Sequence, residues 1–362
     1  MPLSRYVSTR VTYSIAGSKL ATESSSKPVL ACDCIAANCL IFDMQLTGAR
    51  KPPHPVELRI DLMSIAFFTD EDARGPILVH YHIFKNAGST VEYALRREFH
   101  EFFSTFEGPH PNSILTYDQL VEFVKSNPLL RAVSSHHLRY PTLRDDLRPV
   151  IDICVLRHPL DRLFSVYRFL REKYSGKSDL LHQAASELGC AAFFRQCLEK
   201  YPAWMRNVQV GILGPGDPSS APAALAELSR IALLATTDFF DESLVVWEYA
   251  LFPVFPGISL HYLAQNVTHS TPSTLESRLE ELRRLCGRSL YDELLGANAE
   301  DMQLYEVASR MVRERFHQRP DCNQWLEEFR ERNRALAYRC RTSLRARWRT
   351  RFPKHLDYSS QD

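Results

Sequence analysis

Apolar runs and amphipathic stretches alternate along most of the chain. The apolar runs are short and bounded by polar or turn-forming residues, as in strands buried on both faces of a parallel sheet. They lie at residues 77–84, 130–135, 149–156 and 230–237. Helical patterns lie at residues 89–103, 117–126, 160–174, 242–251, 301–316 and 323–339. Strands that alternate with helices predict an α/β fold with an open parallel sheet, helices on both of its faces and a helical C-terminal part.

The first 75 residues have a different composition. Seven serines fall within the first 27 residues, where Glu23 is the only acid. This composition is typical of a transit peptide and equally of a disordered tail. Residues 51–55, Lys-Pro-Pro-His-Pro, predict an extended linker because proline disfavours helix in the residue before it. We therefore expect the folded part to begin after this linker.

Composition and charge exclude several classes of protein. Hydrophobic residues make up 45% of the 362 residues and charged residues 24%, which excludes a mostly disordered chain. The formal net charge of +1 provides no general attraction for nucleic acid or acidic membranes, so no nucleic-acid partner is expected. Nine arginines between residues 330 and 351 form either a solvated helix face or a local contact with an anion.

Cysteine usage and hydropathy bear on the compartment. The nine cysteines are an odd number and most are isolated, which indicates reduced thiols. Cys32, Cys34 and Cys39 lack the paired spacing of a structural zinc site. The longest apolar stretch, residues 29–42, contains Asp33 and is shorter than the roughly 20 residues that span a membrane. These observations predict a cytoplasmic protein without a transmembrane anchor.

One loop carries the clearest chemical signal. Residues 82–90, His-Ile-Phe-Lys-Asn-Ala-Gly-Ser-Thr, follow a predicted buried strand and open a helix. Free amides and the positive end of the helix dipole make such a position an anion site, and Lys85 adds a full charge. Ser89 and Glu92 have the spacing of a capping box. The pattern predicts binding of a phosphate or sulfate group; the alternative is a capped helix with a surface lysine.

The loop is not a nucleotide-binding loop of the Walker A type. Its lysine precedes Gly88 by three positions, whereas that pattern places the lysine directly after a glycine. The strand at residues 149–156 is followed by Arg157 rather than by a metal-binding aspartate, and Asp152 lies in mid-strand. A guanidinium binds phosphate directly through two donors. We therefore expect an anion site that contains no metal.

Two motifs in order resemble those of a known family. Residues 82–90 resemble the 5′-phosphosulfate loop of sulfotransferases that use 3′-phosphoadenosine 5′-phosphosulfate (PAPS), in the carbohydrate branch that includes the heparan and chondroitin enzymes and their bacterial relatives. Residues 156–169 are similar to the 3′-phosphate motif of that family, and Arg157 and Ser165 have its spacing. Shorter similar stretches lie at residues 207–209, 237–243 and 298–305.

The resemblance implies a domain organisation and a reaction. It runs from about residue 76 to about residue 317, which predicts a partly disordered N-terminal extension at 1–75, a sulfotransferase domain at 76–317 and an arginine-rich helical extension at 318–362. The implied fold is P-loop-like. The implied reaction transfers a sulfuryl group from PAPS to a hydroxyl of an acceptor, with a saccharide or glycoconjugate as the expected acceptor.

The resemblance also assigns roles to individual residues. The loop residues that would bind the donor are Lys85, Asn86, Ala87, Gly88, Ser89 and Thr90, and the 3′-phosphate would be bound by Arg157 and Ser165. Lys85 would in addition neutralise charge on the departing nucleotide, because sulfuryl transfer resembles phosphoryl transfer in its loose transition state. This arrangement requires no metal.

The acceptor hydroxyl needs a base, and tandem histidines are the candidates. Residues 134–141, Ser-Ser-His-His-Leu-Arg-Tyr-Pro, follow a predicted strand, and the family places a catalytic histidine in a comparable position. An imidazole can accept a proton near neutral pH. Because successive side chains of an extended segment point to opposite sides, only one of the two should face the donor. We favour His136 over His137.

Two other functions are compatible with parts of the pattern. A P-loop kinase is disfavoured by the missing Walker A pattern and by Arg157. A catalytically silent sulfotransferase-like fold could use the arginine-rich end to bind an anionic polymer. The joint presence of Lys85, His136, Arg157 and Ser165 argues against that second alternative.

Overall fold

A computed structural model describes the part of the chain in which the predicted elements lie. The described residues are 75–110, 112–140, 148–172, 180–214, 221–264 and 274–351, with side chains up to residue 342. The predicted extension at residues 1–75 falls almost entirely outside this range, as do Cys32, Cys34 and Cys39. The six cysteines within it are free thiols. Among the described helices, none is long and apolar enough to cross a membrane.

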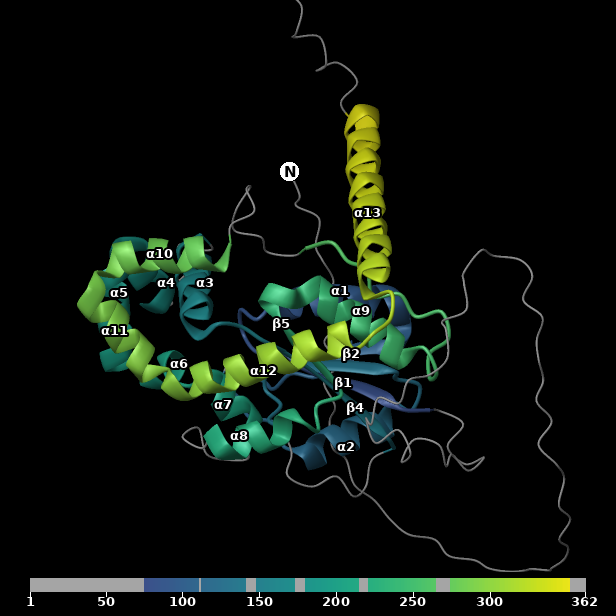
Figure 1. Ribbon diagram of the computed structural model, residues 1–362, viewed down its shortest axis with the longest axis horizontal. Coiled ribbons are helices and arrows are strands. Elements are labelled where there is room, and N and C mark those ends of the chain that lie inside the picture. Colours follow the sequence, from purple (N-terminus) through teal and green to yellow (C-terminus); the bar gives the residue numbers. More distant parts are fainter. Residues whose placement is uncertain are drawn as a thin grey trace, which may run out of the picture. The chain divides into compact units, whose positions relative to one another are not determined.

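Five parallel strands form the predicted sheet (Figure 1). They are β1 (Ile77–Tyr81), β2 (Phe103–Thr105), β3 (Ala132–Ser135), β4 (Val150–Leu156) and β5 (Leu233–Thr236). Their order is β2-β3-β1-β4-β5, and all four neighbouring pairs are parallel. After β1, the chain first forms β2 and β3 on one side of it and then β4 and β5 on the other side. In open parallel sheets, ligands bind beyond the carboxyl ends of the strands at such a reversal of direction.

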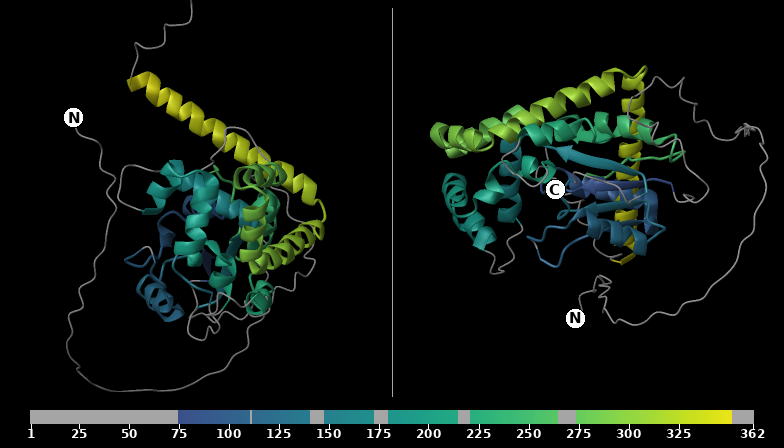
Figure 2. Two further views of the ribbon diagram at one scale, coloured as in Figure 1. Left: turned by 90° about the vertical axis from the view of Figure 1, so that its left-hand side faces the viewer. Right: turned by 90° about the horizontal axis from the view of Figure 1, so that it is seen from below.

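Alternate residues of the strands enter two separate cores, because successive side chains of a strand point to opposite faces. Ile77, Val79 and Tyr81 pack on one face, together with α2 (Tyr117–Ser126), α7 (Val208–Leu213), α8 (Ala221–Leu228) and α12 (Ala299–His317). The opposite face, which includes Leu78, is covered by α1 (Gly88–Phe99), α9 (Phe240–Leu251) and the start of α13 (Cys322–Arg351) (Figure 2). The predicted open parallel sheet with helices on both faces is confirmed.

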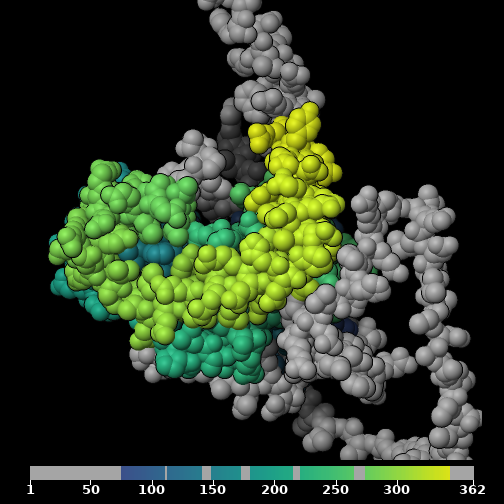
Figure 3. All heavy atoms as spheres, in the orientation of Figure 1, coloured from purple at the N-terminus to yellow at the C-terminus, as the bar shows by residue number. Residues whose placement is uncertain are grey.

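A third hydrophobic core lies entirely among helices. Its helices are α3 (Pro159–Glu172), α4 (Leu180–Glu187), α5 (Cys190–Lys200), α10 (Leu275–Cys286) and α11 (Arg288–Ala297), and the four-residue α6 (Pro202–Met205) contributes Met205. This helical group begins with α3, directly after β4. In the space-filling view α10, α11 and α12 form one continuous surface band that leads into α13 (Figure 3). The predicted helical C-terminal part is thus also present.

Three predicted boundaries need correction. The helix predicted at residues 89–103 ends at Phe99, and Phe103–Thr105 instead forms the edge strand β2. The last predicted helix continues past residue 339 to Arg351. The predicted strand at 77–84 ends at Tyr81, so the loop that follows it is longer than expected. The helix at residues 117–126 has the predicted bounds, and Thr116 and Gln119 form a capping box at its start.

The first turns of α13 belong to the core, and their contribution to stability can be measured. Phe329 is fully buried against α9, whereas Tyr338 on the same helix is 70% exposed. Phe329→Ala should lower the free energy of unfolding by about 3 to 5 kcal/mol, as for other buried aromatic residues. Tyr338→Ala should change it by less than about 0.5 kcal/mol. Denaturant unfolding measures both effects. If Phe329→Ala lowers the free energy of unfolding as little as Tyr338→Ala does, α13 does not contribute to the core.

Candidate functional site

The two sequence motifs meet at the carboxyl end of β1. The loop between β1 and α1 consists of residues 82–87, and both Lys85 and Ala87 have left-handed backbone conformations, with φ of 69° and 59°. Non-glycine residues rarely adopt this conformation, and they retain it where surrounding contacts enforce it. One such contact is the hydrogen bond that Arg157 Nη1 donates to the Lys85 carbonyl at 2.9 Å, across 72 residues of sequence.

Asn86 fixes the β1–α1 loop to the sheet. Its side chain is buried, and its Nδ2 donates to the carbonyl of Val155 at 2.9 Å and to Gln209 Oε1 at 2.7 Å. Its backbone amide donates to Ile83. Asn86 is one of the residues predicted to bind PAPS, but its N–H groups form hydrogen bonds within the protein. The structure therefore indicates that Asn86 positions the loop.

Gln209 connects this loop with the second motif. Its side chain is fully buried; Oε1 accepts from the Arg157 amide and Nε2 donates to the Arg157 carbonyl, both at 2.9 Å. Asp301 in turn accepts from the backbone amides of Gln209 and Val210. Burial raises the pKa of Asp301, and these amides oppose that effect. The short stretches at residues 207–209 and 298–305 therefore form the support behind the loop.

Gly88 must be a glycine because of His82. A Cβ atom at residue 88 would lie 1.9 Å from Cδ2 of the His82 ring, which is an impossible contact. The His82 ring therefore packs directly on the backbone that opens α1. The predicted capping box at Ser89 and Glu92 is wrong: no side chain caps α1, whose N-cap is Ala87. Glu92 makes different contacts.

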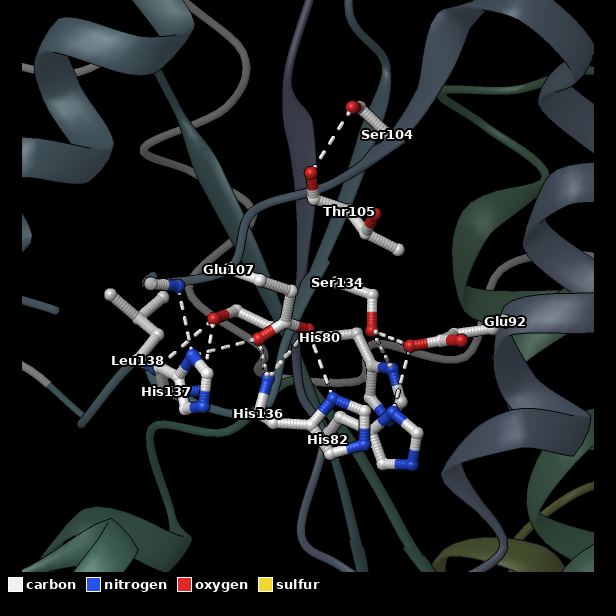
Figure 4. A network of polar contacts seen from close by, with 12 residues as sticks. His80, His82, Glu92, Ser104, Thr105, Glu107, Ser134, His136, His137 and Leu138 are labelled. Carbon is white, nitrogen blue, oxygen red and sulfur yellow. Dashed lines mark hydrogen bonds and ion pairs between the residues drawn. The ribbon is translucent and has the colours of Figure 1, made fainter. Parts of the chain in front are cut away.

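Glu92 organises a buried network of polar side chains (Figure 4). Its Oε1 lies 2.7 Å from His82 Nδ1 and accepts a hydrogen bond from Ser134 Oγ at 2.7 Å. Ser134 Oγ lies 2.9 Å from His80 Nδ1, and because its own proton goes to Glu92 it accepts from His80. Burial lowers the pKa of His80 and of His82. Burial opposes ionisation of Glu92, but His82 and Ser134 lower its pKa to about 2.

A second carboxylate holds the tandem histidines. Glu107 Oε1 lies 2.9 Å from His136 Nδ1, and both carboxylate oxygens accept from the His136 amide. The His136 ring stacks on His82 with 3.7 Å between ring centroids. Figure 4 shows Nε2 of His136 pointing away from Glu107, on the same side as Nε2 of His82. The His136 side chain is 39% exposed, so its Nε2 end can reach a ligand.

The expected opposite orientation of the two histidines is not found. His137 Nδ1 lies 3.1 Å from the other oxygen of Glu107 and accepts from the Gly108 amide at 2.8 Å. The physical reason is that β3 ends at Ser135, whose hydroxyl accepts from the amides of His137 and Leu138. The histidines thus lie in a turn, where side chains no longer alternate. They differ in exposure, because the side chain of His137 is only 13% exposed.

Arg157 is oriented by a buried carboxylate in the first turn of α3. Its Nε donates to Asp161 Oδ2 at 2.8 Å, and Asp161 also accepts two hydrogen bonds from Arg278. Burial opposes ionisation of Asp161, but the two guanidinium groups hold its pKa below the usual value. Arg157 lies in the junction between β4 and α3. Asp161 and Ser165 are one helical turn apart on α3, so Ser165 lies on the face of α3 whose Asp161 holds Arg157.

The Lys85 side chain lies beside aromatic rings. Its Nζ is 4.2 Å from the centroid of Phe169 and 5.9 Å from that of Phe84, distances typical of cation–π contacts. Thr90, another predicted ligand, uses its amide to bond the Ala87 carbonyl at 2.9 Å. Gly88 and Ser89 are the first two residues of α1, so their backbone amides lie at the start of the helix, close to Lys85 in the sequence.

Sequence reasoning missed several residues of this site. Glu107 and Arg278 carried no local signal, because their partners are 29 and 117 residues away. His82 belongs to the predicted anion-binding loop and Glu92 to the predicted capping box, but no sequence pattern indicated that the two side chains contact each other. Donor atoms of His80, His82 and Glu92 lie within 4.8 Å of one another, a spacing at which a metal ion could bind. Glu92 contacts His82 directly and is connected with His80 through Ser134.

The fold and the site define a class: an open parallel α/β protein whose β1–α1 loop and β4–α3 junction meet at the carboxyl ends of the central strands. The chain matches no protein-family model. An uncharacterized protein of Archaeoglobus fulgidus is 28% identical over 254 residues, which are 66% of this chain and 98% of the archaeal protein. This similarity assigns no activity, so the function has to be argued from the site.

The charge on Glu92 should make stability depend on pH. A carboxyl whose pKa falls from 4.5 to about 2 on folding favours the folded state by about 3 kcal/mol at pH 7. Glu92→Gln should lower the free energy of unfolding by that amount. The difference between the variant and the natural protein should be complete above pH 4.5 and shrink as the pH falls toward 2. A difference that does not depend on pH would contradict the network.

The matched control for this measurement is Glu122→Gln. Glu122 is 75% exposed on α2 and forms only a surface ion pair with Lys125. Its replacement should change the free energy of unfolding by less than about 0.5 kcal/mol at every pH.

Proposed function

We propose that this protein transfers a sulfuryl group from PAPS to a hydroxyl of an acceptor. One observation carries the proposal: Arg157 Nη1 donates to the Lys85 carbonyl at 2.9 Å, which joins the two motifs that resemble the 5′-phosphosulfate loop and the 3′-phosphate motif. These motifs are far apart in the sequence, and a donor with phosphate groups at both positions requires them side by side. Their contact at the switch point of a parallel sheet supports this requirement.

Donor binding rests on cations and amides. The amides of Gly88 and Ser89 bind the 5′-phosphosulfate at the positive end of the α1 dipole. Arg157, in the β4–α3 junction, and Ser165, on α3, bind the 3′-phosphate. Asn86 and Gln209 hold the loop and Arg157 in register and do not themselves contact the donor.

The chemical step is an in-line displacement at sulfur. The acceptor oxygen forms a bond to sulfur as the bond between sulfur and the bridging oxygen breaks, and the nucleotide leaves as adenosine 3′,5′-bisphosphate. Negative charge grows on the bridging oxygen, where the ammonium group of Lys85 stabilises it. The step requires no metal, because these cations meet the charge directly.

His136 is the base that accepts the proton of the acceptor hydroxyl. Glu107 orients the imidazole so that Nδ1 carries a proton and Nε2 is the accepting atom. Glu107 also stabilises the imidazolium that forms. Stacking on the neutral ring of His82 fixes the plane of His136 next to the β1–α1 loop.

The acceptor and the compartment belong to the same proposal. The acceptor class is a saccharide or glycoconjugate, as the resemblance to the carbohydrate branch implies. A reducing compartment such as the cytoplasm is consistent with six free thiols among the described residues.

Replacement of Lys85 should separate chemistry from binding. Lys85→Ala should reduce sulfuryl transfer from labelled PAPS by two orders of magnitude or more, because it removes charge stabilisation in the transition state. Affinity for adenosine 3′,5′-bisphosphate in calorimetry should fall much less, since the loop amides and Arg157 remain. Lys125→Ala on α2, where the lysine is 58% exposed, is the control and should change neither quantity. An equal loss of transfer and affinity would reject this role for Lys85.

The pH dependence of turnover tests the base. With saturating donor, turnover should rise with pH, because only the neutral imidazole of His136 can accept the proton of the acceptor hydroxyl. His136→Ala should abolish this rise, whereas His137→Ala should retain it. Glu107→Gln should lower turnover, because the imidazole loses the carboxylate that orients it and stabilises the imidazolium. If His137→Ala alone abolishes the rise while donor affinity is intact, the base is His137.

A further inference from the structure

Asp161 joins two guanidinium groups from distant parts of the chain. It accepts from Arg157 Nε at 2.8 Å, and from Arg278 Nε at 2.8 Å and Nη2 at 2.9 Å. Arg157 comes from the end of β4, whereas Arg278 comes from α10, which is 117 residues after Asp161. Arginine side chains carry a positive charge in proteins, and the hydrogen bonds and charge of Asp161 raise the pKa of Arg278 further.

The burial of these three side chains differs in a way that favours an anionic ligand. The Asp161 carboxylate is only 1% exposed, while Arg157 and Arg278 are 17% and 18% exposed. A group that approaches from solvent therefore meets guanidinium rather than carboxylate. A second acid, Asp238, lies 3.6 Å from Arg278, and its other oxygen accepts from the Tyr305 hydroxyl at 2.5 Å.

Neighbouring contacts between α10 and α3 hold Arg278 in position relative to α3. One turn further along α10, Glu281 pairs with Arg168 of α3 at 2.5 Å. The adjacent Leu282 is fully buried in the core that α3 and α10 share. Two ion pairs and an apolar contact thus hold α10 on the same α3 that carries Ser165.

We propose that Arg278 is a further donor-binding residue that contacts the 3′-phosphate together with Arg157, and that Asp161 is the positioning residue for both. This inference rests on the proposed function. A phosphate monoester carries nearly two negative charges near neutral pH and accepts several hydrogen bonds, which suits two guanidinium groups fixed side by side. The buried Asp161 compensates one of their two positive charges, and Asp238, at 3.6 Å from Arg278, compensates part of the other.

Arg278→Gln separates this role from a purely structural one. Binding of adenosine 3′,5′-bisphosphate and of adenosine 5′-monophosphate is measured by calorimetry for the natural protein and the variant, with unfolding midpoints recorded alongside. The variant should lose about tenfold or more in affinity for the bisphosphate and little for the monophosphate, because only the bisphosphate carries the 3′-phosphate. Asp161→Asn should show the same selective loss through disorder of both arginines.

The matched control is Arg284→Gln, an exposed arginine on the same helix, which should change neither affinity. If the natural protein prefers the bisphosphate and Arg278→Gln keeps this preference undiminished, the inference about Arg278 is overturned while the proposed function stands. Equal losses for both nucleotides with a lower unfolding midpoint would also overturn it, as a structural role. A natural protein that binds neither nucleotide overturns the proposed function and this inference with it.

Discussion

The buried amide of Gln209 is the contact on which the arrangement of the site depends. It pairs with both backbone groups of Arg157 and accepts from the side chain of Asn86, so it connects the end of β4 with the β1–α1 loop. A side chain with one donor and one acceptor end is required here, because the backbone presents one amide and one carbonyl. Asp301 holds the backbone of Gln209 in place from α12.

A common pattern runs through part of the site: two histidines and Arg157 are each held by a carboxylate. Glu92 of α1 holds His82, Glu107 holds His136, and Asp161 holds Arg157. Asp161 is more buried than its partner Arg157, whereas Glu92 is less buried than its partner His82. Such pairs fix orientation and protonation state before a ligand arrives, which reduces the reorganisation needed during reaction.

The fold was largely predictable because its signals are local. Apolar runs and capping residues such as Thr116 act within one element, and they located four of the five strands and the main helices. The edge strand β2 has only three residues, of which Thr105 is exposed, so it has no apolar run of its own. The left-handed Ala87 starts α1, and the hydroxyl of Ser135 turns the chain directly after β3. Neither feature follows from an apolar run, and the capping box and the alternation of the two histidines were therefore predicted wrongly. Partners such as Glu107 and Arg278 are brought together only by the complete fold.

The central place of β1 has a consequence for the synthesis of the chain. β1 pairs with β3 on one side and with β4 on the other, and every pairing in the sheet is parallel. Parallel pairing needs long crossover connections, and such nonlocal contacts form slowly. When β1 leaves the ribosome, neither neighbour yet exists, and at typical elongation rates β4 follows on the order of several seconds later. During that interval the central strand of the finished sheet has an open edge, which makes it a segment in need of protection from pairing with a second nascent chain.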